Sequence, residues 1–175
     1  MTFQSAIDTR YIDHCLKEIT TKSGDKKKIV SSGTLCYRKG LDIFLELSTF
    51  FNDTNVEFIW LGKWPNNGYA ELLKNKIKAG EFPNVQILDH LNHQEYYQAM
   101  QGADLFLSCS REESMGLVMM EAIYCGVPVL ATDSGGSSLI INDQNGKICF
   151  DLRPEILANE VLNLIKAQKQ FDKNL

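Results

Sequence analysis

The chain has 175 residues, a formal net charge of −4, 44% hydrophobic residues and 23% charged residues. A chain of this length forms one domain and buries roughly two thirds of the surface that it exposes when unfolded. The acidic charge and the scattered lysines argue against a nucleic-acid-binding protein, which would present a basic face. No apolar stretch is long enough to span a membrane, and the polar N-terminus does not have the form of a secretory signal.

The five cysteines indicate the compartment. They are an odd number, and no two of them are closely paired along the chain. This usage is typical of a reducing cytoplasm, with neither a disulfide framework nor a zinc site. Cys109 and Cys149 stand in apolar runs and are expected to be small core residues. Nowhere does the sequence offer three or four metal ligands at a workable spacing, so we expect no metal cofactor.

Residues 1–24 are polar and weakly patterned, and we predict a linker-like segment there, followed by one domain at residues 25–175. From residue 28 onward, apolar runs alternate with amphipathic stretches. The apolar runs are predicted as strands at Ile29–Ser32, Val56–Leu61, Val85–Leu88, Leu105–Ser108, Val129–Thr132 and Ile148–Phe150. The other stretches are predicted as helices at Leu41–Asn52, Tyr69–Ala79, His93–Met100, Gly116–Tyr124 and Pro154–Lys169.

This alternation predicts an α/β fold, a Rossmann-like doubly wound parallel sheet of about six strands with helices on both faces. Ligands of such sheets bind beyond the carboxyl ends of the strands, at the point where the strand order reverses. The loops after the strands are therefore the places to look for chemistry. They are Gly33–Gly40, Gly62–Gly68, Asp89–Asn92, Cys109–Met115 and Asp133–Gly136.

The segment 108–136, SCSREESMGLVMMEAIYCGVPVLATDSGG, carries the densest group of candidate residues. A helix that starts at Gly116 points unpaired N–H groups and the positive end of its dipole at whatever lies before it. Because glycine lets a bulky anion approach the backbone, phosphate is the natural ligand there. Glu121 could accept hydrogen bonds from vicinal hydroxyls such as those of a ribose, and Glu113 could reach hydroxyls beyond a diphosphate. Taken singly, each glutamate could merely favour a first helical turn.

The spacing of these residues resembles the motif of glycosyltransferase family 4 (glycosyl transferases group 1), retaining nucleotide-sugar glycosyltransferases with the GT-B fold. That motif runs Ser, two or three residues, Glu, two residues, Gly-Leu, three hydrophobic residues, Glu-Ala, and then Gly-x-Pro-Val. Its places are filled here by Ser110, Glu113, Gly116-Leu117, Glu121-Ala122 and Gly126-Val127-Pro128-Val129. A match in several parts is far more specific than a lone glycine motif.

The resemblance also implies roles for other residues. The loop Gly33–Gly40 is similar to the family's Gly-Arg…Lys-Gly loop, in which the lysine meets the donor diphosphate; here Lys39, with Arg38 beside it, takes that place. Thr34 stands where the family often has a basic residue. The implied catalytic residues are Glu113, Lys39 and Arg38. The implied donor-binding residues are Gly33, Thr34, Lys39, His90, Leu91, Met115, Gly116, Leu117, Val118 and Glu121.

Other kinds of site receive less support. The Gly33–Gly40 loop lacks both the Gly-x-Gly-x-x-Gly spacing of a dinucleotide site and the Gly-Lys-Ser/Thr ending of a phosphate loop. Ser110 and Ser114 have no partnered histidine, so nothing favours a serine nucleophile. His90 and Leu91 occupy a position where family members contact the nucleobase. For His90 a purely structural role stays equally open.

The resemblance thus implies the donor-binding half of a retaining glycosyltransferase, one that transfers a hexose-like sugar from a UDP- or GDP-linked donor to an acceptor hydroxyl in glycan or polysaccharide biosynthesis. It covers nearly the whole chain but only one of the two domains that such enzymes need. We therefore expect an N-terminal acceptor-binding domain as partner, which could dock on a membrane, and little or no activity from this chain alone. Two alternatives stay open: a nucleotide-sugar-binding module without transfer activity, and an epimerase-like relative.

Overall fold

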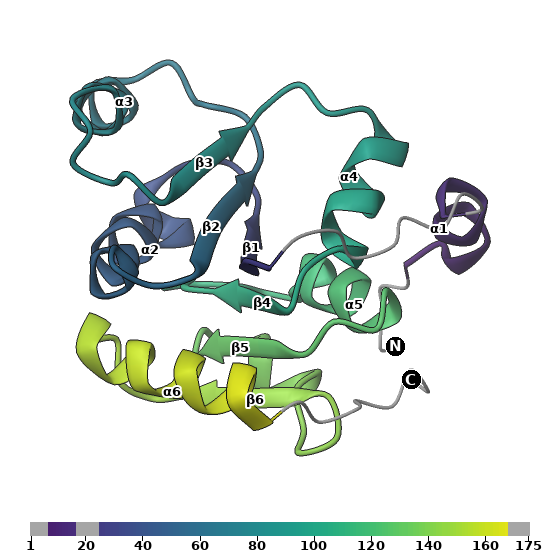
Figure 1. The fold of residues 1–175 in the computed structure, drawn as a ribbon. Helices are drawn as coiled ribbons and strands as arrows, with labels where there is room; N and C mark the ends of the chain where they lie inside the picture. The colour runs from purple at the N-terminus through teal and green to yellow at the C-terminus, as the bar shows by residue number, and fades with distance from the viewer. Residues whose placement is uncertain (1–6, 17–24, 168–175) are drawn as a thin grey trace.

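A computed structural model describes residues 7–16 and 25–167. Figure 1 shows one sheet with helices packed on both sides. The strands are β1 (Lys27–Ser32), β2 (Val56–Leu61), β3 (Val85–Leu88), β4 (Leu105–Ser108), β5 (Val129–Thr132) and β6 (Gly146–Cys149). The α-helices are α1 (Thr9–Cys15), α2 (Leu41–Ser48), α3 (Gly68–Lys78), α4 (His93–Gln101), α5 (Leu117–Tyr124) and α6 (Pro154–Ala167). Short 3-10 helices lie at Tyr37–Lys39, Thr49–Phe51 and Ser137–Leu139.

The sheet confirms the predicted Rossmann-like topology. Its six strands lie in the order β3-β2-β1-β4-β5-β6, and every neighbouring pair is parallel. The order reverses between β1 and β4, where Ile29 pairs with Leu105. Because parallel strands end at the same edge, the loops after β1 and β4 leave the sheet side by side at this switch point.

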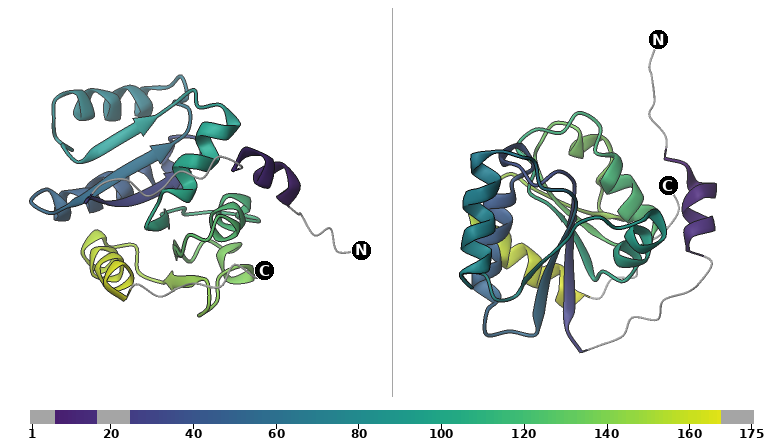
Figure 2. Two further views of the ribbon diagram at one scale, coloured as in Figure 1. Left: turned by 45° about the vertical axis from the view of Figure 1, so that its right-hand side comes forward. Right: turned by 90° about the horizontal axis from the view of Figure 1, so that it is seen from above.

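Strands β1, β2, β4 and β5 bury side chains on both faces, which explains the apolar runs within them. In β2, Phe58 and Trp60 pack into a core with α2, α3 and α6, whereas Ile59 and Leu61 pack into a second core with α1, α4 and α5. Seen from above in Figure 2, the two sets of helices lie on opposite sides of the sheet. The site at the carboxyl edge is therefore built on strands that are fixed from both sides.

Several boundaries differ from those predicted. The predicted strand Ile148–Phe150 is shifted to Gly146–Cys149, and Phe150 is 80% exposed. A side chain at position 146 would meet the backbone of Val129, which lies 2.1 Å from the ideal Cβ, so only glycine permits the pairing with β5 there. Strand β1 begins two residues before Ile29, and the predicted helix Leu41–Asn52 ends as a 3-10 turn after Ser48. The predicted end of the last helix, at Lys169, lies outside the described residues.

Helix α1 is an element that the sequence analysis does not predict. It lies within the segment 1–24, of which only residues 7–16 are described. The side chain of Asp8 caps it by accepting a hydrogen bond from the amide of Tyr11, and Ile12 and Cys15 are buried against α4 and α5. Only two of its seven residues are buried, and so short a segment gives no periodic signal, so tertiary packing is what fixes this helix.

Candidate functional site

The loops after β1 and β4 are in backbone contact. A Cβ atom at Gly40 would lie 2.0 Å from the carbonyl oxygen of Cys109, so this approach requires glycine, whose φ of 73° is also left-handed. The amide of Arg111 donates to the carbonyl oxygen of Arg38 at 2.9 Å, and the Arg38 guanidinium donates to the carbonyl oxygen of Glu112 at 3.2 Å. The two loops therefore behave as one unit.

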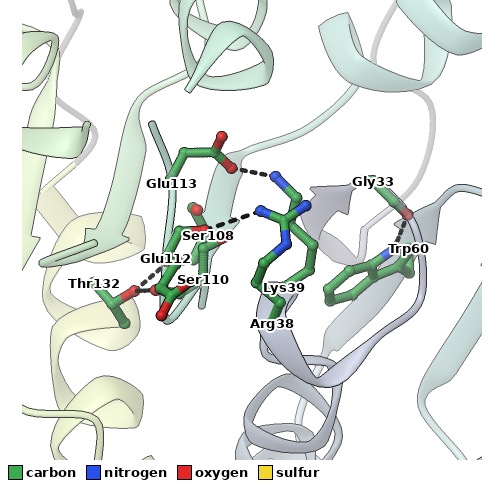
Figure 3. Close-up of polar contacts among 9 residues, drawn as sticks. All are labelled: Gly33, Arg38, Lys39, Trp60, Ser108, Ser110, Glu112, Glu113 and Thr132. Atoms are coloured by element: carbon green, nitrogen blue, oxygen red, sulfur yellow. Dashed lines mark hydrogen bonds and ion pairs between the residues drawn. The ribbon is translucent and has the colours of Figure 1, made fainter. Parts of the chain in front are cut away.

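Lys39 and Glu113 meet across this junction. The Lys39 ammonium forms an ion pair with the Glu113 carboxylate, as Figure 3 shows, although the two residues are 74 positions apart. The side chains are 14% and 13% exposed, so the pair is largely shielded from water. The Lys39 stem passes close to Gly33, where an ideal Cβ would lie 3.5 Å from its Cε atom. The structure thus brings together the predicted residues Gly33, Lys39 and Glu113, while Arg38 and Thr34 lie exposed in the same loop.

The backbone around Glu113 is held by the end of β5. Its amide donates to the carbonyl oxygen of Ser134 at 2.8 Å, and its carbonyl oxygen accepts from the amide of Gly136 at 2.7 Å. Just before it, the Thr132 hydroxyl donates to the carbonyl oxygen of Ser110 at 2.6 Å (Figure 3). The first two bonds occupy the backbone amide and carbonyl of Glu113, and its side chain extends toward Lys39.

Helix α5 begins one residue later than predicted, at Leu117, with Gly116 as its N-cap. Gly116 is left-handed, with a φ of 61°, and its carbonyl oxygen accepts from the amide of Met119 at 2.8 Å. The amides of Leu117 and Val118 come before this bond and, as at the start of any α-helix, have no carbonyl one turn back. Half-buried Met115 precedes them. The helix start predicted at this point of the chain is therefore present in the fold.

Glu121 lies one turn into α5, where two tyrosines of α4 hold it. The Tyr96 hydroxyl donates to Oε2 at 3.1 Å, and the Tyr97 hydroxyl donates to Oε1 at 3.0 Å. Burial, and after it the negative charge of Glu121, raises the pKa of both tyrosines well above 10.0. Nothing in the sequence marks these tyrosines, because their spacing does not indicate that they contact Glu121, which lies about 24 residues further along the chain.

Two small cavities line up along the carboxyl edge of the sheet. One, of about 290 Å³, is lined by Leu91, Asn92, His93, Tyr96, Tyr97 and Glu121. The other, of about 190 Å³, is lined by Ser32, Gly33, Leu61, Gly62, Lys63, Leu88, His90, Leu91 and Tyr96. Leu91 and Tyr96 belong to both, so the cavities are neighbours. The His90 side chain is 81% exposed on a left-handed residue with a φ of 60°.

A further pair that the sequence analysis misses ties the two loops together. The Arg111 guanidinium donates to both carboxylate oxygens of Asp42, at 2.9 and 2.7 Å, and lies 3.7 Å from the centre of the Tyr37 ring. Burial by itself would raise the pKa of Asp42, but the hydrogen bonds and charge of Arg111 outweigh it and hold that pKa below 3.8. No motif marks these residues, since their proximity follows from the neighbouring positions of β1 and β4.

Two further expectations concern metals and membranes. Within residues 7–16 and 25–167, no three His, Cys, Asp or Glu side chains are grouped so that they could hold a metal ion. Among the described helices, none combines the length and apolarity that crossing a bilayer requires. Cys109 and Cys149 are buried core residues, as predicted.

Comparison with known proteins adds an independent line of argument. The family described as Glycosyl transferases group 1 matches residues 15–174. An uncharacterized glycosyltransferase of Methanocaldococcus jannaschii is 26% identical over 154 residues, which are 87% of this chain and 42% of that protein. The lipopolysaccharide core biosynthesis mannosyltransferase LpsB of Rhizobium meliloti is 27% identical over 170 residues, covering 83% of this chain and 48% of LpsB.

The crystal structure of Anabaena HepE in complex with UDP and glucose has the same fold. It superposes with a TM-score of 0.73 at 21% identity, covering 94% of this chain and 45% of HepE. The chain thus spans less than half the length of the relatives and of the solved structure described here. Since the family match extends over nearly all of its residues, the chain belongs to the glycosyl transferases group 1 family, as a domain of the GT-B type.

Proposed function

We propose that this chain is the donor-binding domain of a retaining glycosyltransferase of family 4, with a UDP- or GDP-linked hexose as its donor. One observation carries the proposal: the switch point of the sheet gathers the paired Lys39 and Glu113 and the start of α5 at one edge. Ligands of open α/β sheets bind at this position. The complex of HepE with UDP and glucose supports the same class of ligand.

The geometry suggests an order for the parts of the donor. Glu121 would accept hydrogen bonds from the ribose hydroxyls, with the base toward Leu91 and the 190 Å³ cavity. The diphosphate would lie before the first amides of α5, within reach of Lys39. Beyond the diphosphate, Glu113 would accept hydrogen bonds from hydroxyls of the hexose. The donor would then follow the carboxyl edge from α4 to the junction of the two loops.

In the proposed reaction, the bond between the anomeric carbon and the diphosphate oxygen breaks as an acceptor hydroxyl attacks from the same face, and the hydroxyl proton passes to the departing diphosphate oxygen. Negative charge then accumulates on the leaving diphosphate. Lys39, Arg38 and the amides of Leu117 and Val118 would stabilise that charge, and they are in place before the reaction starts. The pair with Glu113 keeps the Lys39 ammonium at this edge of the sheet, and a bound diphosphate would take the place of Glu113 as its partner.

Two substitutions test donor binding. Lys39→Ala removes a cation beside the diphosphate, and Glu121→Ala removes the acceptor of the ribose hydroxyls. Each should weaken binding of UDP or GDP by about tenfold or more, because hydrogen bonds to charged groups usually contribute that much to affinity. Isothermal calorimetry measures the affinities. Lys147→Ala, in an exposed ion pair with Glu160, is the matched control and should bind as the wild type does. Unchanged affinity in both site variants would refute the assignment.

A further inference from the structure

The hydrogen bonds around Glu121 have a direction. The Ser32 hydroxyl lies 2.9 Å from the Tyr96 hydroxyl, which in turn lies 3.1 Å from Glu121. A carboxylate only accepts hydrogen bonds, and a phenol has one hydrogen to give. The Tyr96 hydrogen therefore goes to Glu121, and Ser32 must donate to the Tyr96 oxygen. The chain of donors runs from β1 through α4 to α5.

Among residues 7–16 and 25–167, each oxygen of the Glu121 carboxylate accepts one hydrogen bond, from Tyr96 at Oε2 and from Tyr97 at Oε1. Each carboxylate oxygen can accept two hydrogen bonds. One acceptor position thus remains on either oxygen, and the pair of positions matches the two O–H donors of a vicinal diol. The carboxylate also lines the 290 Å³ cavity together with both tyrosines, so a ligand in that cavity can reach it.

The two tyrosines also fix the orientation of the carboxylate. The terminal torsion of a glutamate is broad when the side chain is free, so a lone glutamate would present its oxygens at many angles. Tyr97 is only 6% exposed, and the rings of Tyr96 and Tyr97 pack edge to face with centroids 5.1 Å apart. Because these rings are packed, the direction of their hydroxyl groups is set by the core on this side of the sheet.

We propose that Tyr96 and Tyr97 are positioning residues that hold Glu121 ready for a vicinal diol, and that they make the donor site select ribonucleoside diphosphates over their 2′-deoxy counterparts. The inference rests on the proposed function, since it takes the nucleoside of the donor as the ligand of this cavity. A 2′-deoxyribose leaves one acceptor position of a fixed carboxylate without a donor. Sites built to bond a hydroxyl reject analogues that lack it for this reason.

Calorimetric titration with UDP, GDP and their 2′-deoxy counterparts tests the inference. The wild-type chain should bind the better of the two ribonucleotides at least about tenfold more tightly than its 2′-deoxy form. Tyr97→Phe and Tyr96→Phe keep the rings and remove only the hydroxyls. Each should weaken binding of the ribonucleotide by about three- to tenfold and leave the 2′-deoxy form within about twofold, so the selectivity ratio falls.

Tyr124→Phe is the matched control. Tyr124 lies on α5 as Glu121 does, but its hydroxyl donates to Asp13, so the selectivity ratio should stay at the wild-type value. A wild type without selectivity, an unchanged ratio in both α4 variants, or equal losses for both sugars would overturn the inference and leave donor binding intact. A wild type that binds neither UDP nor GDP would overturn the proposed function itself, and this inference with it.

Discussion

At the scale of single residues, the pair of Lys39 and Glu113 connects the two ends of the proposed donor. Lys39 would face the diphosphate and Glu113 the sugar, yet in the structure each is the other's partner. A diphosphate that binds Lys39 therefore competes with a carboxylate already in place. The same carboxylate gains a new role when sugar hydroxyls are present to donate to it.

Glu113→Gln separates these two roles. The variant frees Lys39 and removes a negative charge near the diphosphate, so UDP or GDP without a sugar should bind about three- to tenfold more tightly. The extra affinity gained from the sugar of UDP-glucose or GDP-mannose should shrink, because a neutral amide is a weaker acceptor. Calorimetry with the free and the sugar-linked diphosphates measures both changes. Glu112→Gln, the exposed neighbour, should change neither, and weaker binding of the free diphosphate to Glu113→Gln would contradict this account.

At the scale of elements, the bond between Asp42 and Arg111 joins the start of α2 to the loop after β4. Asp42 has a lowered pKa, so its contribution to stability is fully present above its ordinary pKa of 3.8 and is lost as the pH falls toward the lowered value. The bidentate geometry suits a guanidinium and not an ammonium group. The bond between Asp42 and Arg111 therefore helps to hold the loops that carry Lys39 and Glu113 together, and it weakens when Asp42 is protonated at low pH.

Asp42→Asn tests that link. At pH 7 the variant should unfold more easily by about 1–2 kcal/mol, a modest figure because both side chains are partly exposed and screened by solvent. The difference in thermal midpoint between variant and wild type should shrink as the pH falls below 3.8, because Asp42 then binds a proton in the unfolded chain while the folded state still holds it ionised. Asp151→Asn breaks a more exposed pair, with Arg153, and should change the midpoint at pH 7 less. A difference that stays constant down to pH 3 would exclude the bond as its source.

The strands and helices of the sheet were largely predictable, because strands that bury side chains on both faces appear in the sequence as apolar runs. Val56–Leu61 is the clearest case, with alternate residues in two cores. Helix α1 was not predictable, since Ile12 and Cys15 have their partners on distant elements. The motif residues Glu113 and Glu121 could be found from spacing, but not Tyr96, Tyr97 or Arg111. Their contacts follow from strand order, which brings together residues about 24 to 74 positions apart.

At the scale of the whole molecule, the proposed donor site lies at the carboxyl edge of the sheet, at its switch point. The chain spans 42% and 48% of the two relatives described above. We propose that the acceptor site belongs to a second domain. Transfer depends on holding the acceptor hydroxyl against the anomeric carbon, which supplies much of the rate in such reactions. Donor binding and sugar transfer should therefore be separable properties.

We expect this 175-residue chain to bind a nucleoside diphosphate and to leave its sugar-linked form unchanged. Nuclear magnetic resonance of UDP-glucose and GDP-mannose incubated with the chain follows every product at once. An altered sugar without any acceptor would favour an epimerase-like relative, whereas transfer to an added acceptor would show that this domain suffices. Binding without turnover also fits a nucleotide-sugar-binding module, and joining an acceptor domain from a relative would distinguish the two by restoring transfer.

The contact of Gly40 with the backbone of Cys109 has a consequence for how the family can diversify. The two loops touch through their backbones there. The distance between the loop that carries Lys39 and the loop that carries Glu113 therefore does not depend on the neighbouring side chains. Ser114, next to Glu113, is exposed, and a substitution there should leave the distance between the two loops unchanged. In the proposed reaction, relatives could therefore differ in the sugar that they accept while the contacts of Lys39 with the leaving diphosphate stay the same.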